Sequence, residues 1–72
     1  IRAEYPDAWS NLGMIRFELG ELEEAERSLR YALRLEPRHP DALRHLARVH
    51  RERGDFEEAI RLGMLVGDGE RQ

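Results

Sequence analysis

Apolar residues recur along the chain at spacings of three and four, which is the period of an amphipathic α-helix. Between these stretches stand residues that start and stop helices. Pro6 suits a first helical position, where a missing N–H costs nothing. Gly20 suits the position after a helix end, because glycine readily takes a left-handed conformation. The pattern predicts four helices, over about residues 7–19, 22–35, 40–53 and 56–66.

The chain also nearly repeats itself with a shift of 34 residues. A period of this size indicates an array of helical hairpins. Such arrays work mainly as extended binding surfaces and require no buried reaction centre. The positions that recur in kind are Pro6, Asp7, Ala8, Leu12, Glu18, Gly20, Glu23, Glu24, Ala25 and Arg27, matched by Pro40, Asp41, Ala42, Leu46, Glu52, Gly54, Glu57, Glu58, Ala59 and Arg61.

The spacing of certain large, small and turn residues resembles the signature of the tetratricopeptide repeat family. In the first repeat these residues are Trp9, Leu12, Gly13, Gly20, Ala25, Leu29, Ala32 and Pro37. In the second they are Leu43, Leu46, Ala47, Gly54, Phe56 and Ala59, and the match weakens after Leu62. The resemblance implies an all-α fold of two antiparallel helix-turn-helix hairpins stacked as a right-handed α-solenoid. It divides the chain into the end of an upstream repeat (1–5), repeat one (6–39), repeat two with an atypical last helix (40–66) and a flexible tail (67–72).

Length and composition narrow the classes of function. The 72 residues allow one small domain or a piece of a longer protein. There is no cysteine, so the chain has neither disulfides nor thiolate metal sites. The net charge of -3 argues against a nucleic-acid partner. No apolar run is long enough to span a bilayer, so we expect no membrane partner and a soluble, cytoplasmic protein.

The same resemblance implies where a ligand would lie, because the first helix of each hairpin lines the concave groove in this family. By position, the groove residues are Asp7, Ser10, Asn11, Met14, Phe17 and Glu18 in repeat one, and Asp41, Arg44, His45, Arg48, Arg51 and Glu52 in repeat two. Those taken as peptide-binding candidates are Asn11, Met14, Phe17, Arg44, His45, Arg48 and Arg51.

Four of these candidates form a basic stripe at helical spacing, opposite the apolar face of the third helix. Guanidinium groups bind carboxylates in a forked geometry, so the stripe favours an acidic peptide. The alternative is a solvated arginine-rich helix face that Asp41 and Glu52 partly neutralise. Two further alternatives stay open: Asn11 contacts a peptide backbone or is a plain surface residue, and Phe17 contacts a ligand or packs inward. The stripe consists of Arg44, His45, Arg48 and Arg51.

Nothing in the chain indicates catalysis, a cofactor or a bound metal. His45 and His50 are five residues apart, which is off the spacing that places two ligands on one helix face. His50 falls in a packing position, so we interpret it as a buried imidazole. The glutamates between Glu21 and Glu26 are interpreted as a solvated helix start that uses the helix dipole.

The sequence therefore favours a non-catalytic protein-interaction module that binds a short, acidic, extended peptide. One alternative is an assembly segment that associates with another copy through uncapped apolar ends, at Leu62, Leu65 and Val66. Another is a module that presents substrates to an enzyme elsewhere in a longer polypeptide.

Overall fold

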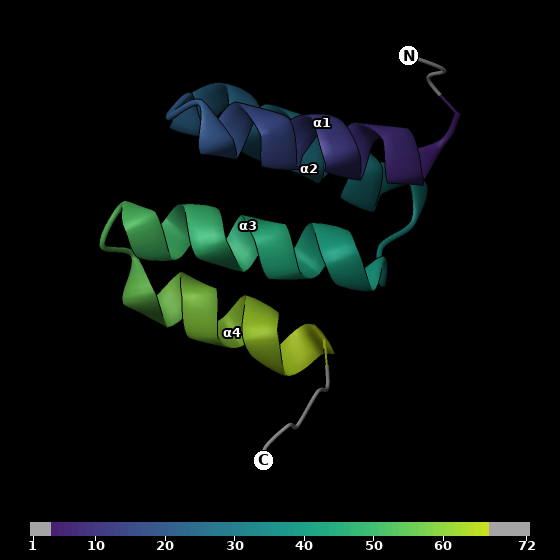
Figure 1. Cartoon of the computed structure of the whole chain (residues 1–72). Coiled ribbons are helices and arrows are strands. Elements are labelled where there is room, and N and C mark those ends of the chain that lie inside the picture. The colour runs from purple at the N-terminus through teal and green to yellow at the C-terminus, as the bar shows by residue number, and fades with distance from the viewer. Residues whose placement is uncertain (1–3, 67–72) are drawn as a thin grey trace.

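A computed structural model of the protein describes the backbone of residues 4–66 and the side chains of residues 4–63. Within that range the chain forms α-helices joined by short turns, with no β-strand (Figure 1). The all-α fold of helical hairpins predicted from the sequence is therefore confirmed. The helices are α1 (Pro6–Glu18), α2 (Leu22–Leu35), α3 (Pro40–Glu52) and α4 (Phe56–Val66).

The turns after α1 and α3 are closed in the same way, by a glycine with a left-handed backbone. Gly20 has a φ angle of 82° and Gly54 one of 85°, a conformation that other residues rarely adopt. At the first turn the N–H of Gly20 donates to the carbonyl of Phe17 at 2.9 Å, and Glu21 donates to Arg16 at 2.9 Å. Equivalent bonds close the second turn, so carbonyl groups left open by each helix end find donors.

Within the first hairpin, α1 and α2 approach most closely at Gly13. A Cβ atom placed there would lie 2.5 Å from Cγ of Leu29, which is far inside van der Waals contact. Ala25 and Leu29 on α2 are fully buried against this point. The small residue on α1 thus lets a large one on α2 enter the core, as the predicted hairpin requires.

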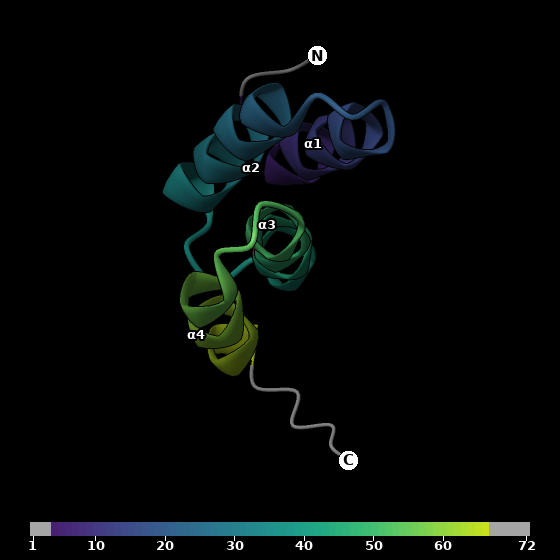
Figure 2. The same cartoon turned by 90° about the vertical axis from the view of Figure 1, so that its left-hand side faces the viewer.

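The second hairpin docks onto the first through α3, which contacts both α1 and α2. Figure 2 places α1 and α3 on one side of the molecule, with α2 and α4 on the other. The apolar side of α3 supplies much of the core, since Leu43, Leu46 and Val49 are almost completely buried. The opposite side of α3 is exposed to solvent and forms one surface together with α1.

Leu62 corrects one expectation about the end of the molecule. The sequence predicts it on an exposed apolar end, but it is only 5% exposed and belongs to the core cluster. The reason is that α4 packs along α3 and turns Leu62 inward. The side chains of Leu65 and Val66, and the predicted tail 67–72, lie outside the described residues.

Candidate functional site

The surface shared by α1 and α3 contains two hollows, and we call it the α1–α3 groove. The larger hollow, about 380 Å³, is lined by Phe17, Glu18, Gly20, Leu22, Arg48 and Glu52. The smaller, about 250 Å³, is lined by Asp7, Ser10, Asn11, His39 and Asp41.

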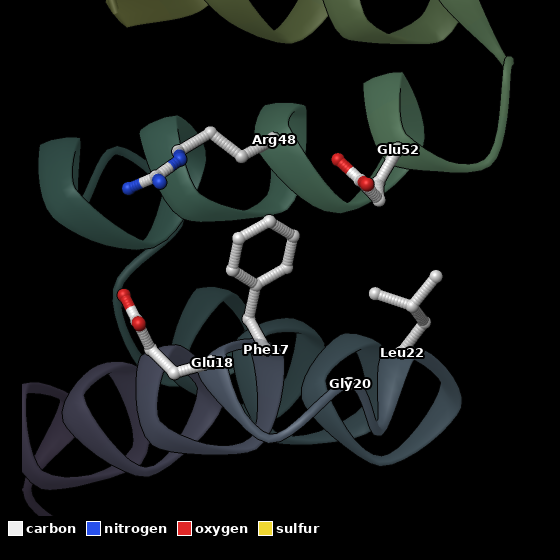
Figure 3. A pocket seen from close by; sticks show the side chains of 6 residues that line it. All are labelled: Phe17, Glu18, Gly20, Leu22, Arg48 and Glu52. Carbon is white, nitrogen blue, oxygen red and sulfur yellow. The ribbon is translucent and has the colours of Figure 1, made fainter.

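Arg48 and Phe17 form the centre of the larger hollow. The guanidinium carbon of Arg48 lies 5.1 Å from the centre of the Phe17 ring, within the range of a cation–π contact. Figure 3 shows the ring standing between the helices, with Arg48 and Glu18 on one side of it and Glu52 and Leu22 on the other. Phe17 also packs against the core cluster, so it combines the inward and outward roles that the sequence left open.

The arginines of the predicted basic stripe differ in how they are paired. Arg44 donates to the carboxylate of Asp41 at 3.1 Å, so part of its charge is neutralised. Arg48 and Arg51, in contrast, form no ion pair with any side chain among residues 4–63. Of these two arginines, Arg48 lines the larger hollow, whereas Arg51 lines neither hollow.

His45 lies half-buried on α3 near Arg44 and Arg48, and its surroundings favour the neutral imidazole. Burial lowers the pKa of its imidazole below the ordinary value of 6.5, and the positive charges of Arg48 and Arg44 lower it further. The charge of Asp41 acts in the opposite direction without reversing the shift. His45 Nδ1 is buried and has no hydrogen-bond partner in the described part of the chain.

The smaller hollow is organised by a contact that the sequence did not indicate. The Nδ1 atom of His39 accepts a hydrogen bond from the N–H of Ala42 at 3.0 Å and so caps the start of α3. With Nδ1 acting as an acceptor, the ring proton of the neutral imidazole is on Nε2, which lies 2.5 Å from Oδ1 of Asp7 on α1. These two contacts of His39 therefore join the two hairpins beside Asn11.

The remaining candidates lie along α1. Asn11 is exposed in the smaller hollow, and Met14 is half-buried one turn further along the helix. Ser10 is 1% exposed, and its hydroxyl oxygen has no hydrogen-bond partner among the described residues. The groove thus offers an exposed amide at one end and, at the other, the guanidinium of Arg48, which has no ion-pair partner among the described side chains.

No group of three or more histidine, cysteine, aspartate or glutamate side chains is placed to hold a metal ion within the described residues. His50 is buried, as predicted, with Nδ1 3.2 Å from a carboxylate oxygen of Asp55. That contact lacks the alignment of a hydrogen bond. In the described range, no helix is both long and apolar enough to cross a membrane.

The fold and the repeat signature agree with a comparison to known protein families. The family model described as tetratricopeptide repeat matches residues 10–63, well over half of the chain. The chain belongs to the tetratricopeptide repeat family. Repeats of this family generally act as non-catalytic protein–protein interaction modules. Among curated proteins, none matches the chain.

In this tetratricopeptide repeat pair, the signature residues and the groove residues do different work. Gly13 and Ala25 make the close contact between helices, and Gly20 closes the turn. Arg48 and Asn11 lie outside that signature and face the groove. The partner must therefore be argued from the groove itself.

Proposed function

We propose that this tetratricopeptide repeat pair binds a short, extended, acidic peptide along the α1–α3 groove. Arg48 is the observation that carries the proposal. Its guanidinium is held over the Phe17 ring and lines the larger hollow, yet it has no ion-pair partner among the described side chains. A planar guanidinium fixed in this way is prepared to accept a carboxylate with little loss of side-chain freedom.

The rest of the groove supports an extended ligand. Arg51 lies about one turn further along α3, outside both hollows, and adds a second positive charge that has no ion-pair partner among the side chains of residues 4–63. At the other end, the exposed amide of Asn11 has both a donor and an acceptor for a peptide backbone. Between them, Met14 and Phe17 offer apolar contact. A peptide that places its acidic side chains toward Arg48 and Arg51 satisfies all three features.

The carboxylates in the groove define the orientation we expect. Asp7 and Asp41 line the smaller hollow, while Glu18 and Glu52 border the larger one. Each hollow has two carboxylates, but only the larger one has an arginine to offset them, so the negative end of the peptide lies over α3 near Arg48. Electrostatic matching of this kind sets specificity and association rate more than total affinity.

The proposal is tested by fluorescence anisotropy with a labelled acidic peptide and a basic peptide of the same length, at low and high salt. We expect the acidic peptide to bind more tightly, and its affinity to fall with salt because the contacts are charged and exposed. Arg48→Gln should weaken binding by about tenfold, corresponding to about 1.4 kcal/mol. Arg38→Gln is the matched control, because Arg38 is exposed in the turn before α3 and lines neither hollow.

Indifference to peptide charge would contradict the proposal. So would equal affinities of the Arg48→Gln protein and the Arg38→Gln protein for the acidic peptide.

A further inference from the structure

The two repeats have the same length, so a residue of the first repeat has its structural counterpart 34 residues further along the chain. Helices α1 and α3 begin at Pro6 and Pro40, and the left-handed glycines are Gly20 and Gly54. The interface between α2 and α3 therefore shows how one repeat packs on the next. If the packing of α2 on α3 is repeated between α4 and another helix equivalent to α1, it predicts which residues would cover the outer face of α4 and the matching outer face of α1.

On α1, that outer face is apolar and uncovered. Val49 of α3 is completely buried, whereas its counterpart on α1, Ile15, is 55% exposed. Leu46 is also buried, while its counterpart Leu12 is half-buried and lines a shallow hollow with Trp9. The difference arises because α2 packs against this side of α3, whereas no helix among the described residues covers the matching side of α1.

On α4, the face equivalent to the α3-contacting side of α2 is also apolar and uncovered. Phe56 is 59% exposed and Ile60 is 64% exposed. Their counterparts on α2 are Leu22, which lines the hollow with Arg48, and Glu26, which pairs with Arg53. Isolated exposed apolar residues are common, but here the exposure falls at positions that the internal interface uses.

The decisive feature is a paired replacement. Inside the molecule, Glu26 of α2 accepts a hydrogen bond from Arg53 at 2.6 Å, which joins one repeat to the next. The counterpart of Glu26 is Ile60, and the counterpart of Arg53 is Leu19, which is 65% exposed. Both members of the ion pair have thus been replaced by leucine or isoleucine. An apolar contact between Ile60 and Leu19 would be complementary in the same place.

We propose that a second copy of this chain stacks head to tail on the first, with α4 of one copy packed against α1 of the next. Phe56 and Ile60 of one copy cover Ile15 and Leu19 of the following copy. Because the two faces differ, the contact is heterologous and leaves a free face at each end. This interface is separate from the α1–α3 groove, so it does not depend on peptide binding.

Sedimentation velocity of the whole chain from micromolar to millimolar concentration tests the proposal. We expect the average mass to rise beyond a dimer, because a heterologous contact does not close on itself. Ile60→Glu and Leu19→Arg should each weaken association by about tenfold or more, since each places an unpaired charge against an apolar side chain. The variant that carries both changes should recover association to within about threefold of the unchanged protein, since it recreates the Glu26–Arg53 pair.

Two controls separate the contact from effects of net charge and folding. Arg38→Gln and Glu57→Gln change the net charge at exposed positions outside both faces and should leave association unchanged. Circular dichroism of each variant checks that its helices are intact. Acrylamide quenching of Trp9 should fall with protein concentration, because stacking covers this residue.

Three results would overturn the proposal. The first is a folded protein that stays monomeric at every concentration. The second is loss of association in Ile60→Glu with none in Leu19→Arg, which would indicate pairing of α4 with α4. The third is a double variant that associates no better than the single ones.

Discussion

The carboxylate of Asp7 lies 2.5 Å from Nε2 of His39, and it joins the start of α1 to the start of α3. His39 is buried, although the Asp7 side chain is 86% exposed. The same imidazole caps α3 through the N–H of Ala42. One side chain therefore fixes a helix start and the junction between two repeats, at the edge of the hollow that contains Asn11.

His39→Ala should lower the free energy of unfolding by about 1–2 kcal/mol, because it removes a helix cap and leaves the N–H of Ala42 without its partner. Asp7→Ala should cost less, since the cap on α3 is retained. Urea unfolding followed by the fluorescence of Trp9 measures both changes. Equal losses in the two variants would mean that the cap contributes little.

Gly13→Ala and Gly63→Ala should shift stability in opposite directions. At Gly13 the new methyl group would overlap the buried Leu29, so we expect a loss of about 1–2 kcal/mol after the gain in helix propensity. At Gly63 a Cβ meets nothing within 4 Å, so the propensity gain of about 0.5–1 kcal/mol remains. Thermal unfolding by circular dichroism compares them. A stabilised Gly13→Ala protein would contradict the close approach of α1 and α2.

Glu26→Gln should weaken the junction between repeats by about 0.5–1 kcal/mol at neutral pH. Burial alone would raise the pKa of Glu26, but hydrogen bonds from Arg30 and Arg53 outweigh it and lower that pKa. Its contribution is thus present above the ordinary carboxyl pKa and lost as the pH falls through the lowered value. Urea unfolding at several pH values should show the difference from the unchanged protein vanish in acid.

Glu24→Gln is the matched control for that measurement. Glu24 pairs with Arg27 within α2 on an exposed surface, so its loss should matter less. If both substitutions had the same effect, the Glu26–Arg53 bridge would have no special role between the repeats.

His45 should titrate below pH 6.5, because burial and the nearby arginines favour its neutral form. Between that lowered pKa and 6.5 the unfolded chain binds more protons than the folded one, so His45 reduces stability as the pH falls through this range. An NMR titration of the imidazole protons measures the pKa directly, and His45→Gln should remove its share of the pH dependence. A value at or above 6.5 would contradict the environment described for α3.

The helices were predictable from sequence because their ends are marked by residues with local effects. Proline starts α1 and α3, and a left-handed glycine follows each of them, so no distant contact is needed to set these boundaries. The family resemblance placed both Phe17 and Arg48 on the groove, but the contact between them is known only from the structure.

Other contacts depended on features that no local pattern carries. His39 is not a preferred capping residue, and its partner Asp7 is 32 positions away, so neither role was visible. Leu62 was placed on the wrong side because the rotation of α4 about its axis is decided by packing on α3. Pairing of Arg44 with Asp41, three residues apart on one helix, was by contrast one of the alternatives that the sequence offered, and it leaves Arg48 and Arg51 as the arginines of the basic stripe without an ion pair among the described side chains.

The central claim is that an acidic peptide lies along the α1–α3 groove with Arg48 as its anchor. Titrating the isotope-labelled protein with such a peptide, and following its amide and arginine side-chain NMR signals, tests this most directly. The account predicts saturable shifts concentrated at Asn11, Phe17 and Arg48. The Arg48 side-chain signal is assigned by its absence from the spectrum of Arg48→Gln. Shifts confined to α2 and α4, or none at saturating peptide, would contradict it.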